Sequence, residues 1–279
     1  MKIGIIGLGL IGGSLGFDFR QLGHTVFGVA RKPATCDAAI ARGAVDQAST
    51  SLASMQTVEV VFICTPIAVI ESTAIALIPY LQPETVITDV GSVKGAIVYA
   101  MAQHWPYFVG GHPMAGKTEV GVTAAEPHLF ADRAYVITPT QQTPDLAIAT
   151  VKGLAQSLQA KVFICSPEVH DRAVSWISHL PVMISSSLIQ SCLHEPDPQV
   201  RELAQQFASS GFRDTSRVGG GHPELGVMMA RYNQAEVLRS LQAYGAEITR
   251  LAQLIQEGEW ETIAAKLAEN HHTRPRFLE

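Results

Sequence analysis

The segment from residue 1 to residue 23 constrains the fold more than any other part of the chain. An apolar run, Ile3 to Ile6, ends in the pattern Gly7-x-Gly9-x-x-Gly12, and an amphipathic segment from Ser14 to Gly23 follows directly. This order predicts a buried strand, a tight glycine turn and a helix start, whose free N–H groups can bind a pyrophosphate. We therefore expect a dinucleotide site here, the alternative being a purely structural turn.

The residues after the second expected strand, His24 to Ala30, indicate which dinucleotide is bound. An NAD-binding domain usually has Asp or Glu at this point to hold the ribose diol. This chain has Arg31 and Lys32 instead, followed by Pro33. A guanidinium can bind a 2′-phosphate with two N–H groups, so the pair favours NADP over NAD. The alternative is two solvated cations at a helix start.

Composition is typical of a globular protein with one large or two medium domains. The chain has 279 residues, of which 47% are hydrophobic and 16% are charged, and its formal net charge is −5. That charge provides no general attraction to nucleic acid or to an anionic membrane. No apolar run reaches the roughly 20 residues that span a bilayer. The chain opens directly on a strand, so no signal peptide is expected.

Four cysteines, at positions 36, 64, 165 and 192, show no CxxC spacing. Neither disulfides nor a bound metal are therefore expected. Reduced thiols fit a cytoplasmic protein best.

The order of apolar runs predicts an α/β fold with two domains. Strands and helices alternate as far as residue 165, with further strands expected at 58–64, 85–90, 107–110, 134–138 and 161–165. This alternation favours a mostly parallel sheet, and thus a Rossmann domain over residues 1–166. From residue 167 to residue 279 only helical periods are visible, which indicates an all-α domain.

One expected helix in the second domain, from Asn233 to Gln256, is unusually long. It would extend about 36 Å, more than so small a domain needs. We therefore favour a homodimer formed through the helical domain, the alternative being a lone helical subdomain.

Polar residues at the ends of expected strands mark a candidate active site. In an open parallel sheet the ligand crevice lies outside the carboxyl ends of the strands. Thr65, Ser92 with Lys94, and His112 fall at such ends. Each has a structural alternative: a turn, a helix N-cap and a buried hydrogen-bonding histidine, respectively. His112 is favoured as a catalytic group because its glycine neighbours, Gly110, Gly111 and Gly116, leave space for a ligand.

Six segments together resemble the prephenate/arogenate dehydrogenases of tyrosine biosynthesis. They are Gly7 to Ser14, Asp89 to Lys94, Gly110 to Gly116, His170 to Ala173, Ser178 to Pro181 and Gly211 to Arg217. The resemblance implies a Rossmann domain followed by a helical dimerisation domain. It also implies an oxidative decarboxylation, in which a cyclohexadienol loses hydride from C4 and carbon dioxide from C1 and becomes a phenol.

The resemblance also implies roles for individual residues. His112 would accept the proton of the C4 hydroxyl, since a neutral imidazole is a suitable base at physiological pH, and Ser92 would orient the hydroxyl or the imidazole. Arg217 would bind a carboxylate, unless it pairs with Asp214, and His179 would contact the substrate, unless it is a core histidine. Lys94 and Gly221 complete the expected substrate contacts. The expected NADP contacts are Gly7, Leu8, Gly9, Leu10, Ile11, Gly12, Ala30, Arg31, Lys32, Cys64, Thr65, Pro66, Gly91, Ser92 and Met114.

The two substrates to be distinguished are arogenate and prephenate, which differ in their side chains. Arogenate carries an ammonium, which the Gly219–Gly221 loop or Glu224 could hold, and NADP-preferring members of the family tend to use it. Gly226 stands where many relatives have a tryptophan. We favour L-arogenate, with prephenate dehydrogenase and a dual-specificity cyclohexadienyl dehydrogenase as alternatives. A β-hydroxyacid dehydrogenase is disfavoured because Ser178 to Gln190 contains no lysine. A non-catalytic NADP-binding sensor is the alternative from another class.

Overall fold

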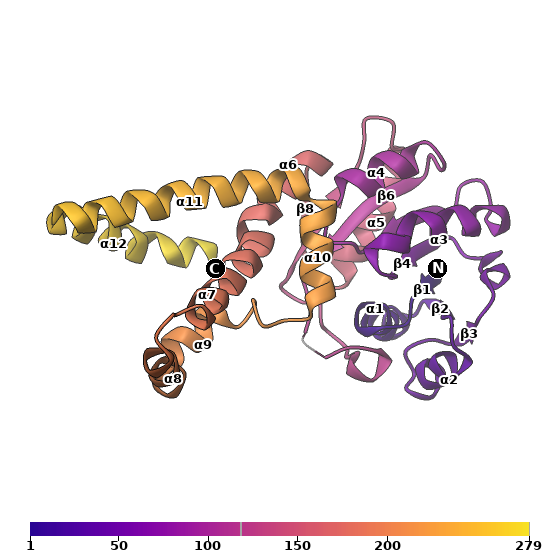
Figure 1. Ribbon diagram of the computed structural model, residues 1–279. Coiled ribbons are helices and arrows are strands. Elements are labelled where there is room, and N and C mark those ends of the chain that lie inside the picture. Colours follow the sequence, from indigo (N-terminus) through magenta and orange to yellow (C-terminus); the bar gives the residue numbers. More distant parts are fainter. Residues whose placement is uncertain (118, 279) are drawn as a thin grey trace. The chain divides into compact units, whose positions relative to one another are not determined.

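The computed structural model describes residues 1–117 and 119–278, which divide into two compact units (Figure 1). Unit 1 contains Met1–Ile177 and Gly221–Asn233, and unit 2 contains the remainder. An α/β unit carrying the sheet and a separate helical unit were both expected, and both are confirmed.

Unit 1 is built on an eight-stranded sheet with the order β3-β2-β1-β4-β5-β6-β7-β8. All neighbouring strands are parallel except β6 and β7, which are antiparallel. The strands are β1 (Lys2–Ile6), β2 (Thr25–Val29), β3 (Gln47–Ser49), β4 (Val60–Ile63), β5 (Val86–Asp89), β6 (Phe108–Pro113), β7 (Ala134–Thr138) and β8 (Lys161–Ile164).

Two features of the sheet differ from the expectation. The edge strand β3 was not expected, because three residues are too few for a visible hydrophobic pattern. Strand β6 continues to Pro113 rather than ending at Gly110, so His112 lies inside the strand and pairs with Val136 of β7. The backbone that carries His112 is therefore held by sheet hydrogen bonds.

Helices cover both faces of this sheet and enclose two separate hydrophobic cores. One core contains residues of α1 (Leu10–Gln21), α2 (Pro33–Ala41) and α5 (Asp145–Ser157). The other contains residues of α3 (Ile70–Leu77) and α4 (Gly95–Ala102). Val60 and Phe62 belong to the first core, and Val61 and Ile63 belong to the second. This alternation follows from the two-residue period of a strand that is buried on both faces.

The two packing units do not follow the domain boundary expected after residue 166, which stays a prediction. Helix α6 (Pro167–Val174) belongs to unit 1, where the Asp171 carboxylate accepts backbone N–H groups of Lys94 and Gly95. Helix α10 (Pro223–Tyr232) also returns to unit 1, and Asn233 after it donates its amide to the Asp171 carbonyl at 2.8 Å. Hydrogen bonds between distant segments, which a sequence pattern does not reveal, cause this difference.

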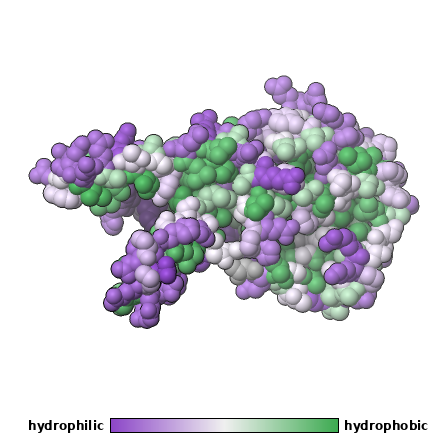
Figure 2. Space-filling model, viewed as in Figure 1, coloured by the Kyte–Doolittle hydropathy of each residue, from purple (hydrophilic) through white to green (hydrophobic). Residues whose placement is uncertain are grey.

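The described part of unit 2 contains helices and no strand. It contains α7 (Leu180–Leu193), α8 (Pro198–Phe207), α9 (Ser210–Ser216), α11 (Gln234–Glu257) and α12 (Trp260–Thr273). Helix α11 has 24 residues, which confirms the long helix expected from Asn233 to Gln256. Apolar residues are exposed on these helices, and Figure 2 shows apolar patches among their polar surface. Over the described residues, no helix has both the length and the apolar character needed to cross a membrane.

Candidate active site

The glycine-rich turn packs β1, α1 and the end of β4 together. Gly7 has a φ of +100°, and a Cβ there would lie 2.5 Å from the Cys64 carbonyl oxygen. A Cβ on Gly12 would collide with the Gly7 carbonyl oxygen. Both positions therefore require glycine, as the dinucleotide-binding pattern predicts.

The start of α1 is suited to bind an anion. The helix begins at Leu10, and its N-cap residue, Gly9, provides no side-chain cap. The first turn contains no acidic residue. A Cβ built on Gly9 would meet no atom within 4 Å, so there is open space in front of the turn. The first N–H groups of the helix can therefore bind a phosphate.

A buried polar atom close to this turn supports the same interpretation. Thr65 follows β4, and its Oγ1 atom is buried without a hydrogen-bond partner among the described residues. A Cβ on Gly7 would lie 3.0 Å from the Thr65 backbone nitrogen. A buried hydroxyl without a partner is rare, and a bound polar ligand is one way to satisfy it. The residues at this point thus fit a dinucleotide.

The remaining expected cofactor residues lie at the same edge of the sheet. Arg31 and Lys32 follow β2 and are exposed, while Ala30 before them is buried. Gly91 and Ser92 follow β5, and Met114 follows β6. Since the sheet order places the carboxyl ends of β2, β1, β4, β5 and β6 side by side, the fold brings these segments to one edge.

The ammonium of Lys94 is not directed to solvent. Its side chain is 0% exposed and forms an ion pair with Asp89, which is also 0% exposed. The Lys94 Nζ atom donates to the Gly111 carbonyl at 2.8 Å, and Asp89 accepts the N–H groups of Gly91 and Gly111. Burial lowers the pKa of Lys94, although Asp89 opposes this effect. The pair therefore connects the loop that carries Ser92 to the strand that carries His112.

His112 is 8% exposed and is part of a chain of polar side chains. Its Nδ1 atom lies 2.8 Å from Nε2 of His170, and Nδ1 of His170 lies 2.7 Å from Oδ1 of Asp171. His170 and Asp171 belong to the segment His170 to Ala173, whose pattern predicts no individual function for either residue. The signal in the sequence that indicates a site at these residues is their position at the start of a helix that follows a strand.

The other expected substrate residues lie in different environments. His179 ends a π-helical segment, Ser175–His179, and is 0% exposed. Arg217 follows α9 and is exposed. Asp214 forms an ion pair with Arg213 at 3.4 Å. The alternative role of Arg217, an ion pair with Asp214, is not observed among the described residues. Gly221 is exposed in the turn before α10.

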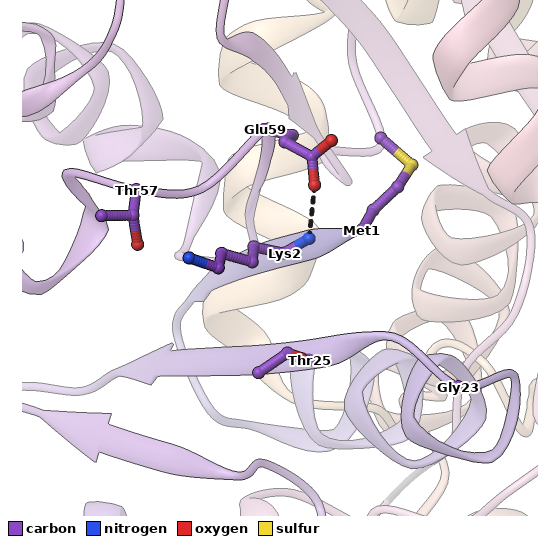
Figure 3. A pocket seen from close by; sticks show the side chains of 6 residues that line it. All are labelled: Met1, Lys2, Gly23, Thr25, Thr57 and Glu59. Atoms are coloured by element: carbon purple, nitrogen blue, oxygen red, sulfur yellow. Dashed lines mark hydrogen bonds between the residues drawn. The ribbon is translucent and has the colours of Figure 1, made fainter.

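Two hollows lie in the surface of the described part of unit 1. One is at the amino ends of β1 and β2, at the opposite edge from the glycine turn, and Glu59 there accepts the N–H of Lys2 at 2.6 Å (Figure 3). The other lies beside the end of β6, and its lining includes Met114, Ala115 and Gly116. Only the second adjoins the predicted cofactor residues, so we do not assign a function to the first.

Comparisons with known proteins give matches over both parts of the chain. Residues 15–164 match the family model "Prephenate dehydrogenase, nucleotide-binding domain", and residues 166–269 match "Prephenate dehydrogenase, dimerization domain". The chain is 31% identical over 269 residues to a prephenate dehydrogenase of Bacillus subtilis, covering 93% of this chain and 71% of the relative. It is 28% identical to a cyclohexadienyl dehydrogenase of Zymomonas mobilis, covering 98% of each chain.

Solved structures with a similar fold include dehydrogenases of the same kind. The fold is similar to that of Synechocystis arogenate dehydrogenase, with a TM-score of 0.92, 47% identity, and coverage of 99% of this chain and 100% of that one. It is also similar to a prephenate dehydrogenase of A. aeolicus in complex with hydroxyphenyl propionate and NAD+. There the TM-score is 0.93 and the identity is 26%, with coverage of 99% of this chain and 98% of that one.

Proposed function

Because this chain belongs to the prephenate dehydrogenase family, we propose that it oxidatively decarboxylates L-arogenate to L-tyrosine with NADP as the oxidant. The observation that carries the proposal is His112, a buried imidazole on β6 at the sheet edge where the glycine turn lies. The 47% identity with Synechocystis arogenate dehydrogenase supports arogenate over prephenate. Prephenate, or both substrates, is the second candidate, supported by the Bacillus and Zymomonas relatives.

In the proposed reaction, His112 accepts the proton of the C4 hydroxyl as that carbon acquires carbonyl character. A neutral imidazole, with an ordinary pKa of about 6.5, can do so at physiological pH. Ser92, half-buried in the loop after β5, orients the hydroxyl. A nicotinamide held at this sheet edge would supply the hydride acceptor for C4. Loss of carbon dioxide from C1 then leaves an aromatic ring.

The proposed cofactor site uses the sheet edge described above. The backbone of Gly7, Gly9 and Gly12 and the first turn of α1 bind the pyrophosphate. Arg31 and Lys32 bind the 2′-phosphate, which is what favours NADP. The segments after β4, β5 and β6 contact the nicotinamide end through Cys64, Thr65, Pro66, Gly91, Ser92 and Met114.

Arg217, His179 and Gly221 are the proposed substrate contacts. The exposed guanidinium of Arg217 suits a carboxylate, which it can bind with two N–H groups. Lys94 is also expected from the sequence to contact the substrate, but its surroundings favour a different role. Its buried ammonium is held by Asp89 and Gly111, so we propose that it supports the Ser92 loop instead.

We also propose that the protein acts as a homodimer. Residues 166–269 match a dimerization domain, and α11 exposes apolar side chains along its length, namely Leu238, Tyr244, Ile248, Leu251 and Ile255. A cytoplasmic location agrees with the four cysteines, all of which are free thiols.

Four initial rates test substrate and cofactor together. The purified protein is mixed with arogenate or prephenate and with NADP or NAD, and the absorbance of the reduced nicotinamide is followed. We expect the highest kcat/KM with arogenate and NADP. A higher value with prephenate would contradict the proposed substrate, and a higher value with NAD would contradict the proposed cofactor.

The role of His112 is tested by His112→Asn. Turnover should fall by roughly 10²–10⁴-fold, because a general base typically contributes that much to the rate. Binding of NADP, measured by titration, should be nearly unchanged. His104→Asn, at an exposed position after α4, is the matched control and should retain full activity. Equal loss of NADP binding and turnover in His112→Asn would show that the assigned role is wrong.

A further inference from the structure

Three buried side chains of unit 1 form a hydrogen-bonded chain that ends on the proposed base. His112 Nδ1 lies 2.8 Å from His170 Nε2, and His170 Nδ1 lies 2.7 Å from Asp171 Oδ1. The side chain of His170 is 1% exposed and that of Asp171 is 11% exposed. The proposed mechanism uses His112 but assigns no function to the other two.

The direction of these hydrogen bonds follows from the carboxylate. An ionised carboxylate only accepts hydrogen bonds, so the proton between Asp171 and His170 belongs to Nδ1 of His170. In a neutral His170, Nε2 then carries a lone pair and accepts. The proton between the two imidazoles therefore belongs to Nδ1 of His112. A neutral His112 in this state has its lone pair on Nε2.

We propose that His170 and Asp171 are positioning residues that hold His112 in the Nδ1-protonated tautomer, so that Nε2 accepts the substrate proton. This inference rests on the proposed function and deepens it. A neutral histidine has two tautomers, and only the one with an unprotonated nitrogen facing the hydroxyl can act as a base. In the proton-transfer step the O–H bond of the substrate breaks and an N–H bond forms at Nε2. His112 thereby becomes an imidazolium, and no proton needs to leave His170.

Asp171 also holds the loop that carries Ser92. Its Oδ1 accepts the N–H of Lys94 at 2.7 Å, and its Oδ2 accepts the N–H of Gly95 at 2.8 Å. Lys94 in turn donates to the carbonyl of Gly111, the residue before His112. One carboxylate on α6 therefore orients the imidazole of the base through His170 and the Ser92 loop through two backbone N–H groups. Both groups proposed to act on the C4 hydroxyl are positioned by the same side chain.

The variant Asp171→Asn tests the arrangement. An amide has one acceptor oxygen and one donor group in place of two acceptors, so it cannot satisfy both His170 and the two N–H groups. We expect kcat to fall by at least 100-fold, with KM for the substrate and the affinity for NADP changed less than threefold. Glu168→Gln, on the same helix but bonded to exposed Tyr99, is the matched control and should leave kcat unchanged. An unchanged kcat in Asp171→Asn would overturn the proposal.

A measurement on the wild-type protein keeps the test independent of any folding defect in the variant. The ring ¹⁵N signals of histidine-labelled holoenzyme, assigned with His112→Asn, report which nitrogen carries the proton. We expect Nδ1 of neutral His112 to be protonated and Nε2 to be unprotonated. The opposite pattern would overturn the proposal. If the wild type oxidises neither arogenate nor prephenate, the proposed function fails, and the tautomer is still decided by this measurement.

Discussion

At the scale of single residues, Lys94 illustrates how a charge next to a ligand crevice can be part of the scaffold. A lysine after a strand end is a reasonable expectation for a substrate contact. In the structure its ammonium is buried against Asp89 and the Gly111 carbonyl. Its pKa is lowered by burial, and without Asp89 a charge at this position would be strongly unfavourable.

We therefore expect Lys94→Met to destabilise unit 1. The substitution leaves the Asp89 carboxylate buried without its cation, which typically costs about 3–5 kcal/mol. Chemical denaturation should show this loss in the free energy of unfolding. Lys152→Met, at an exposed position of α5, is the control and should change that free energy by about 0.5 kcal/mol or less. Equal stability of the two variants would contradict the structural role.

Arg31 is the residue on which the cofactor preference depends. It is exposed after β2, where a carboxylate would instead favour NAD. Arg31→Ala should raise KM for NADP at least tenfold, which corresponds to about 1.4 kcal/mol. KM for NAD should stay within about twofold, because only NADP carries the 2′-phosphate. Steady-state kinetics with each cofactor measure both values. A parallel change in the two would refute the 2′-phosphate assignment.

At the scale of elements, the glycine turn and α1 form one unit with the end of β4. A Cβ at Gly12 would strike the Gly7 carbonyl and approach the Cys64 side chain, so the helix could no longer lie against the strand. Gly153 has no such constraint. In α5, a Cβ built on Gly153 meets no atom within 4 Å.

These two glycines provide a matched pair of variants. Gly12→Ala should weaken NADP binding at least tenfold, because the turn has to shift away from the phosphate position. Gly153→Ala should leave NADP binding unchanged and raise the free energy of unfolding by roughly 0.5–1 kcal/mol, since alanine restricts the unfolded chain. Calorimetric titration and denaturation measure the two effects. Normal NADP affinity in Gly12→Ala would show that the turn does not bind the phosphates.

At the scale of the whole molecule, the proposed homodimer is the main expectation. Exposed apolar residues on α11, such as Ile248 at 49% exposure, are unusual for a helix that faces only water. Light scattering after gel filtration should give twice the chain mass of 30.0 kDa. Ile248→Glu should raise the dimer dissociation constant at least tenfold, since it buries a charge. Gln256→Glu, also on α11, is the control and should leave the dimer dissociation constant unchanged. A monomeric wild type would refute the proposal.

Local patterns were sufficient to predict much of this protein. The glycine spacing, the alternation of strands and helices, and the period of α11 are properties of neighbouring residues, and the structure confirms the elements they indicate. Such features are encoded within about one strand or a few helical turns, so they can be read without knowledge of the fold.

The environment of the proposed base could not be obtained in this way. His112 and His170 are 58 residues apart, and Asp171 and Lys94 are 77 apart. These contacts exist because β5 pairs with β6 and because α6 packs in unit 1, and neither fact is contained in a local pattern. The amino-acid pattern alone predicts His112 as the base, whereas the hydrogen bonds from which its tautomer is proposed depend on long-range packing.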